Sequence, residues 1–93
     1  MEIQKIKAII EAILFSAGRI VTEEELILAL EIDKKQIEEI IKSMQEEYRT
    51  RGIEIIKIEN GYQLCSKKEY YDYIYPILDK RTKPNLSQAA LET

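Results

Sequence analysis

The sequence has no histidine and no tryptophan, and its 93 residues include a single cysteine, Cys65. Without histidine, acid–base catalysis would depend on carboxylates or lysines, and no imidazole could activate the Cys65 thiol. The chain also lacks a cysteine pair and an acidic loop with alternating ligand positions, so the usual zinc and calcium sites are excluded. We therefore expect no enzymatic activity, no catalytic residue and no metal, and interpret Cys65 as a structural or surface residue.

Glycine is also scarce, and Gly18, Gly52 and Gly61 are too far apart to form a phosphate-binding loop. No cofactor is therefore expected. A lone cysteine cannot form an internal disulfide, which favours a cytoplasmic protein. Charged residues interrupt the apolar runs near the N-terminus well before the length needed for export or membrane spanning, so no membrane segment is expected.

The chain has no excess of positive charge: 14 Lys and Arg stand against 17 Asp and Glu, a net charge of −3. This balance argues against a protein whose main task is to coat nucleic acid, because phosphate neutralisation needs clustered basic residues. The hydrophobic content of 45% is sufficient for a core, and 33% charged residues give a polar surface. One small globular domain is the expected result.

Apolar spacing and capping signals predict three helices in the first half of the chain. The first covers residues 2–17 and ends at Gly18, and the second covers about 23–30 behind a Thr22–Glu25 capping box. The third starts after Asp33, with Gln36 completing its cap, and Gly52 is expected to end it as a left-handed cap. Its apolar stripe consists of Ile37, Ile40, Ile41, Met44 and Tyr48.

An isoleucine-rich segment, residues 53–59, is followed by Asn60-Gly61 and by a returning segment, residues 62–66. Asn-Gly is the strongest short hairpin signal, so a β-hairpin is predicted here. Isoleucines of both parities occur in the first strand, which indicates either a bulge or burial on both faces. Residues 19–21 predict no more than a strand fragment. The order of three helices and a hairpin predicts a mainly α fold with a small β-hairpin (α+β), a winged helix-turn-helix domain.

A fourth, shorter helix is predicted over residues 67–78, with Pro76 expected to stop or kink it. Residues 1–80 are therefore expected to form the winged-helix domain, and residues 81–86 a polar linker. Residues 87–93 begin another helix behind Ser87 and stop before two turns, which indicates the truncated start of a second winged-helix domain.

Two groups of residues are candidates for a partner or dimer interface. On the first helix, Ala8, Ala12 and Phe15 lie on a second side, opposite the main apolar stripe. This side is buried beneath the hairpin or the last helix, or it contacts a second subunit. The other group is the tyrosine cluster, which cannot all face one core on so short a helix and which serves either core packing or partner binding. It consists of Tyr70, Tyr71, Tyr73 and Tyr75.

If this domain recognised DNA, the outward face of the third helix would be the surface that contacts the bases. Acidic and basic residues alternate there, so the face neutralises itself, and Glu39 and Glu46 would meet phosphates with the wrong sign. The residues are Lys35, Glu39, Lys42, Glu46 and Arg49. A second basic group is interpreted as solvated loop residues: Lys67, Lys68, Lys80, Arg81 and Lys83. Direct DNA binding is therefore not expected.

Taken in order, these segments resemble the segregation and condensation protein B (ScpB) family. The resemblance covers nearly the whole chain: residues 9–18 resemble the family's opening helix and residues 22–26 its second helix. Residues 52–55 through 61–64 resemble its wing, and residues 86–93, LSQAALET, resemble the start of its second winged-helix domain. No single segment is a chemical motif, so the specificity lies in their order and spacing.

The resemblance implies a non-enzymatic accessory subunit of the bacterial SMC condensin complex, in the cytoplasm and associated with the nucleoid. It implies a homodimer that binds the kleisin ScpA, and SMC through ScpA, in chromosome condensation and segregation. Interface residues are not carried over from the family one by one. The alternative is a winged-helix transcriptional regulator that binds DNA.

Overall fold

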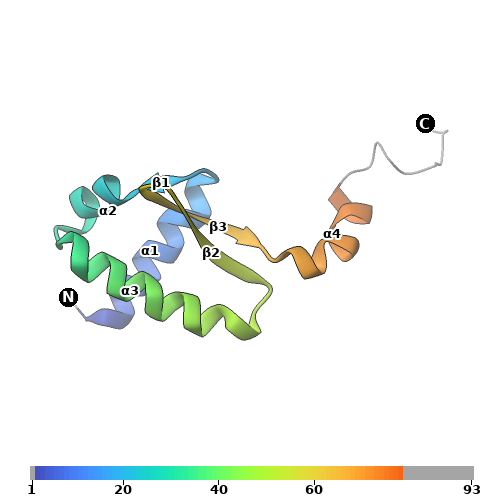
Figure 1. Cartoon of the computed structure of the whole chain (residues 1–93), viewed down its shortest axis with the longest axis horizontal. Helices are drawn as coiled ribbons and strands as arrows, with labels where there is room; N and C mark the ends of the chain where they lie inside the picture. The colour runs from blue at the N-terminus through green and yellow to red at the C-terminus, as the bar shows by residue number, and fades with distance from the viewer. Residues whose placement is uncertain (1, 79–93) are drawn as a thin grey trace.

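The computed structural model describes residues 2–78, and the expected linker and second-domain start lie outside these residues. The predicted order of three helices, a hairpin and a fourth helix is confirmed (Figure 1). The elements are α1 (Ile3–Ala17), β1 (Val21–Thr22), α2 (Glu23–Leu30), α3 (Lys34–Glu47), the 3-10 turn η1 (Tyr48–Thr50), β2 (Ile53–Ile58), β3 (Gly61–Ser66), the 3-10 turn η2 (Lys68–Tyr70) and α4 (Tyr71–Leu78).

The predicted helix boundaries of α1, α2 and the start of α3 are confirmed by their caps. Gly18 ends α1 in the left-handed conformation, with φ of 61°. Thr22 and Glu25 form the capping box of α2. Asp33 and Gln36 form the box of α3. In each box the side chain at the cap accepts from a backbone N–H that has no partner inside the helix.

The left-handed cap predicted at Gly52 is wrong, because Gly52 is not among the described residues with positive φ. Instead, α3 continues into η1, and a lysine side chain binds two backbone carbonyls of η1. The Lys67 ammonium donates to the backbone oxygens of Tyr48 and Arg49, each at 2.7 Å. A cation is favourable there because the C-terminal end of a helix carries partial negative charge.

The strands form an antiparallel sheet in the order β1-β3-β2. The β2–β3 register runs without interruption from Ile53↔Ser66 to Ile58↔Gly61. A bulge therefore does not explain the isoleucines of both parities. Ile55 is buried in the core, whereas Ile56, on the other face, is half-buried, so both faces of the strand are partly covered.

The hairpin turn lies one residue earlier than predicted: it consists of Glu59 and Asn60, and Gly61 belongs to β3. Gly61 is needed because β3 and the segment around β1 approach each other closely at this position. A Cβ at this position would lie 2.6 Å from the Ile20 side chain and 2.8 Å from the Val21 carbonyl oxygen. The two residues of β1 can thus pair with β3 only because the side chain is absent.

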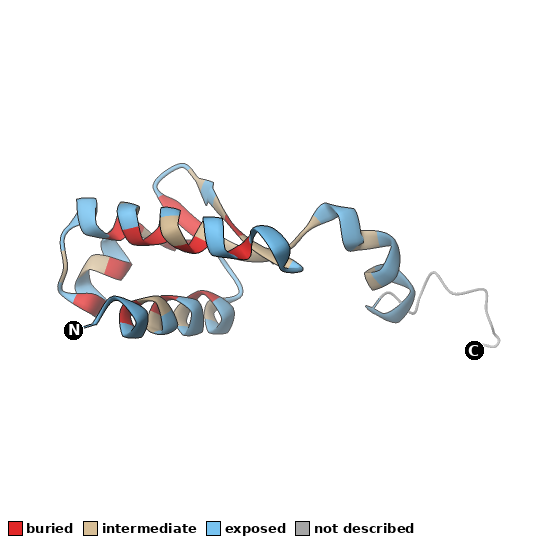
Figure 2. Ribbon diagram, turned by 90° about the horizontal axis from the view of Figure 1, so that it is seen from below, coloured by how far each residue is buried: buried red, intermediate tan, exposed pale blue. Residues whose placement is uncertain are grey.

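The core lies between α1, α2, α3 and one face of the sheet. In Figure 2 the buried residues occupy the sides of α1 and α3 that face each other and the adjoining strands. The largest fully buried side chains are Ile10, Leu14, Leu26, Ile37, Ile41 and Met44. The predicted stripes of α1 and α3 supply most of this set. No helix in residues 2–78 is long and apolar enough to cross a membrane.

Helix α4 stands apart from this body. Figure 1 shows that it projects away from the sheet after β3, and none of its residues is buried. Pro76 does not stop the helix, which includes it and is described as far as Leu78. An eight-residue helix is marginal in water without tertiary packing. The apolar side chains of α4 are therefore available to a partner.

Candidate functional site

The side of α1 opposite the core is exposed in this chain. Ala8, Ala12 and Phe15 are all accessible, and the Phe15 side chain is 77% exposed. Within residues 2–78, neither the hairpin nor α4 covers this side, so burial of these three residues is not observed there. Because Ala8 and Ala12 are small, this side of α1 is flat along them and ends at the exposed Phe15 ring.

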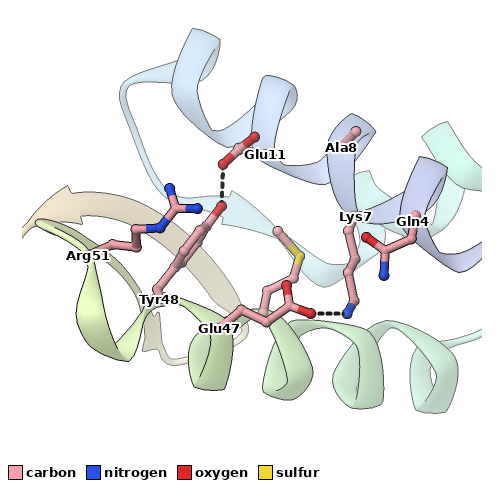
Figure 3. Close-up of a pocket in the computed structure, with 8 residues that line it drawn as sticks. Gln4, Lys7, Ala8, Glu11, Glu47, Tyr48 and Arg51 are labelled. Atoms are coloured by element: carbon pink, nitrogen blue, oxygen red, sulfur yellow. Dashed lines mark hydrogen bonds and ion pairs between the residues drawn. The ribbon is translucent and has the colours of Figure 1, made fainter.

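A pocket of about 220 Å³ adjoins this strip, between α1 and the end of α3 (Figure 3). Ala8 is part of its lining, so the pocket and the exposed side of α1 share a wall. The other lining residues are Gln4, Lys7 and Glu11 from α1 and Met44, Glu47, Tyr48 and Arg51 from the facing segment. Glu11 and Phe15 are four residues apart and thus neighbours on the helix surface. Phe15 itself is not part of the lining.

Most polar groups in this pocket are already paired. The Lys7 ammonium lies 2.5 Å from the Glu47 carboxylate and 2.9 Å from the Ser43 hydroxyl. The Tyr48 hydroxyl donates to Glu11 at 2.5 Å, and burial together with this hydrogen bond raises the pKa of Tyr48. Within residues 2–78, the Arg51 guanidinium has neither a hydrogen bond nor an ion pair. Arg51 thus has no direct partner among the described residues, although the carboxylates of Glu11 and Glu47 line the same pocket.

The tyrosine cluster is the second candidate surface, and the structure places it at and beyond the start of α4. Tyr73 is 75% exposed, Tyr70 and Tyr75 are exposed, and Tyr71 is half-buried. The ring centroids of Tyr71 and Tyr75 lie 5.4 Å apart, so these two rings pack against each other. None of the four tyrosines is buried among the described residues, so packing into the core is not observed there.

The face of α3 expected to neutralise itself is fully exposed. Arg49 forms an ion pair with Glu46 on the same face. In the second basic group, the Lys67 ammonium donates hydrogen bonds to backbone carbonyls of η1, and Lys68 is exposed. Lys80, Arg81 and Lys83 lie outside the described residues. The described part of the chain therefore presents no concentrated basic face.

The described residues give no sign of a metal site or of a reactive thiol. In the part of the chain that is described, no group of three His, Cys, Asp or Glu could hold a metal ion. Burial raises the pKa of the Cys65 thiol, and the nearby Glu54 adds to this shift. A raised pKa disfavours the thiolate, which is the reactive form.

Sequence reasoning missed the pocket and its charged residues. Lys7 and Glu47 are 40 positions apart, and periodicity within one helix does not report such a pair. The one available signal was that Lys7 and Glu11 border the exposed side of α1, where polar residues separate two apolar faces.

Comparison with protein families identifies residues 8–93 as matching the family described as "Segregation and condensation complex subunit ScpB". The chain belongs to the ScpB family. A segregation and condensation protein B from Acetivibrio thermocellus is 46% identical to it over 100% of this chain and 48% of the relative. The Bacillus subtilis protein of that name is 38% identical over 99% of this chain and 48% of the relative. The chain thus spans about half the length of these curated relatives.

Two solved structures from the family have the same fold. One is a dimer of the ScpB N-terminal domain complexed with ScpA peptide, with a TM-score of 0.76 and 26% identity over 82% of this chain and 98% of that one. The other is ScpB from Mycobacterium tuberculosis, with a TM-score of 0.80 and 23% identity over 99% of this chain and 59% of that one. The mainly α winged-helix fold with a small antiparallel sheet is confirmed.

Proposed function

We propose that this ScpB-family chain is a non-enzymatic accessory subunit of the SMC condensin complex, which dimerises and binds the kleisin ScpA in chromosome condensation and segregation. It contacts SMC through ScpA, and it acts in the cytoplasm at the nucleoid. The family assignment supports this function, as does the solved dimer of a similar domain with ScpA peptide. We also propose that residues 1–80 form the winged-helix domain, followed by the linker 81–86 and the start of a second domain at 87–93.

The observation that carries the proposal is that two apolar surfaces of this small domain are uncovered. One is the exposed side of α1 with Phe15, and the other is α4 with Tyr71 and Tyr73. Large aromatic side chains that protrude from a folded domain are typical anchors of protein interfaces. We assign the α1 side, with Ala8 and Ala12, to a second copy of the chain, and the Tyr70–Tyr73 region to ScpA.

The alternative, a DNA-binding regulator, receives no support from the geometry. The exposed face of α3 carries carboxylates between its cations, and Arg49 is paired with Glu46. A reader of the major groove needs basic or amide side chains free to reach base edges. We therefore expect no binding to duplex DNA under conditions in which ScpA binds.

The test is the absolute mass of the chain by light scattering after gel filtration, alone and mixed with a central segment of ScpA. We expect a mass near twice 10.9 kDa, which increases further when ScpA is added. A chain that stays monomeric and gains no mass with ScpA contradicts the proposal. A shift of labelled duplex DNA at the same concentrations would favour the regulator instead.

A further inference from the structure

The pocket between α1 and α3 and the exposed Phe15 ring are complementary features that a single chain leaves unused. Building on the proposed homodimer, we propose that Phe15 of each copy occupies the α1–α3 pocket of the other, across a two-fold axis that makes the two α1 helices antiparallel. Phe15 is not part of the pocket's lining in its own chain, so the ring and the pocket remain separate within one copy. The interface is then complete only when two copies meet.

Helix geometry provides the required register. Ala8 and Phe15 are seven residues apart, which places them on the same side of α1 and about 10 Å from each other along its axis. A two-fold axis between Glu11 and Ala12 sets each Phe15 opposite the partner's Ala8. Ala8 lines the pocket, so the ring of one copy is directed at the pocket of the other. The small side chains of Ala8 and Ala12 let the helices approach closely.

The pocket is large enough for a phenyl ring, although most of its lining residues are polar. Its volume is about 220 Å³, and an enclosed apolar cavity of about 150 Å³ holds benzene. The lining residues that offer apolar surface here are Ala8, Met44 and Tyr48. The Tyr48 ring provides an aromatic wall, and aromatic pairs are attractive beyond the area that they bury. The unpaired Arg51 guanidinium can lie over the face of an incoming ring, a cation–π contact. Of the other charges, Lys7 is paired with Glu47, and the Glu11 carboxylate accepts a hydrogen bond from the neutral Tyr48 hydroxyl.

The charges that line the pocket balance. Lys7 and Arg51 stand against Glu11 and Glu47, so the pocket offers no net positive charge to an acidic peptide. A neutral aromatic side chain brings no charge that would have to be matched. The occupant that the chain itself offers is Phe15, whose side chain is 77% exposed.

Two variants test the contact from its two sides by sedimentation equilibrium. Phe15→Ser removes the ring, and Ala8→Arg fills the pocket entrance; both positions are exposed, so we expect circular dichroism to show an unchanged fold. Each variant should dimerise at least about tenfold more weakly than the unchanged chain. The matched control is Leu28→Ser, which removes another exposed apolar side chain (80% exposed) from α2 and should leave dimerisation unchanged.

Mixing the two variants gives the decisive result. In a mixed dimer the Ala8→Arg copy still offers Phe15 and the Phe15→Ser copy still offers an open pocket, so one of the two contacts is restored. The mixture should therefore dimerise more strongly than either variant alone. No gain on mixing, or variants that dimerise like the unchanged chain, would overturn the inference while the dimer itself stands. An unchanged chain that is monomeric throughout would instead contradict the proposed homodimer.

A disulfide provides an independent check on the register. In a Cys65→Ser background, chains with Ala8→Cys are mixed with chains with Phe15→Cys and oxidised. The two positions are too far apart within one helix to bridge, so any 8–15 disulfide joins two copies. We expect efficient crosslinking between positions 8 and 15 and little between positions 8 and 28. The reverse pattern would overturn the antiparallel arrangement.

Discussion

Two tyrosine–glutamate pairs join elements that are distant in the sequence. Tyr62 on β3 donates to Glu23 at 2.8 Å, and Tyr48 on η1 donates to Glu11 on α1. Their surroundings differ, because Glu23 is 6% exposed whereas Glu11 is exposed. A buried acceptor that loses its donor cannot recover the hydrogen bond from water. The two pairs should therefore contribute unequally to stability.

Tyr62→Phe and Tyr48→Phe form a matched comparison of these pairs. We expect Tyr62→Phe to lower the free energy of unfolding by about 1–3 kcal/mol, since among the described residues the Glu23 carboxylate then keeps only Lys34, 3.8 Å away. Tyr48→Phe should cost about 0.5–1.5 kcal/mol, because water can reach Glu11. Urea denaturation followed by circular dichroism measures both. Equal losses would show that burial of Glu23 does not decide the effect.

The Arg19–Glu25 ion pair predicts a pH dependence of stability. The hydrogen bond from Arg19 and the backbone N–H of Thr22 lower the pKa of Glu25 to about 2. Because the folded-state pKa lies below the ordinary value of 4.5, this contribution to stability is present above pH 4.5 and is lost as the pH falls through about 2. Glu25→Gln keeps a residue suited to the capping box, so its urea midpoint should vary less between these pH values. Glu24→Gln, at an exposed neighbouring position, is the control. A pH dependence unchanged by Glu25→Gln would contradict this assignment.

Elements with local signals were predictable, and contacts between distant elements were not. Caps and apolar stripes fixed α2 and most of α3, because a helix end is determined by residues three or four positions apart. Asn60-Gly61 located the hairpin, but the turn is shifted by one residue because Gly61 is required by the neighbouring Ile20. The Lys67 cap could not be read from the sequence, since its acceptors lie 18 and 19 residues away.

Alanine substitutions at Gly61, in the sheet, and at Gly52, just before it, should differ in their effect on the free energy of unfolding. Gly61→Ala would place a Cβ 2.8 Å from the Val21 carbonyl oxygen, and relieving this clash must shift β1. We expect a loss of about 1–3 kcal/mol in the free energy of unfolding. Gly52→Ala meets open space and should be neutral or stabilising by up to about 1 kcal/mol. Thermal unfolding distinguishes the two, and a Gly61→Ala domain as stable as the unchanged chain would contradict the packing argument.

For the molecule as a whole, the fold of the helices and the hairpin could be predicted from the sequence, but the exposed apolar surfaces could be predicted only in part. The interface candidates could be recognised because their apolar side chains lie outside the stripes that face the core. These candidates are Ala8, Ala12, Phe15 and the tyrosines. Sequence could not decide whether α4 covers the body or stands away from it, because this depends on where β3 directs the chain. Within residues 2–78, neither group is buried.

The position of α4 predicts that its tyrosines can be removed without harming the fold. Tyr71→Ala combined with Tyr73→Ala should leave the melting temperature of the body unchanged, because no α4 residue is buried. We expect ScpA binding, measured by calorimetry, to weaken by about tenfold or more. Leu28→Ala, which removes an exposed apolar side chain of α2, is the control. Unchanged affinity in the double variant would exclude α4 as the ScpA surface.

The Lys67 ammonium that binds the carbonyls of Tyr48 and Arg49 also fixes the point at which the chain leaves the sheet. Residue 67 directly precedes η2, and α4 follows, a helix about 12 Å long with no buried residue. The residue from which the chain leaves for α4 is therefore anchored to η1, the segment that follows α3. We expect a partner that displaces η1 to change the direction in which α4 leaves the body.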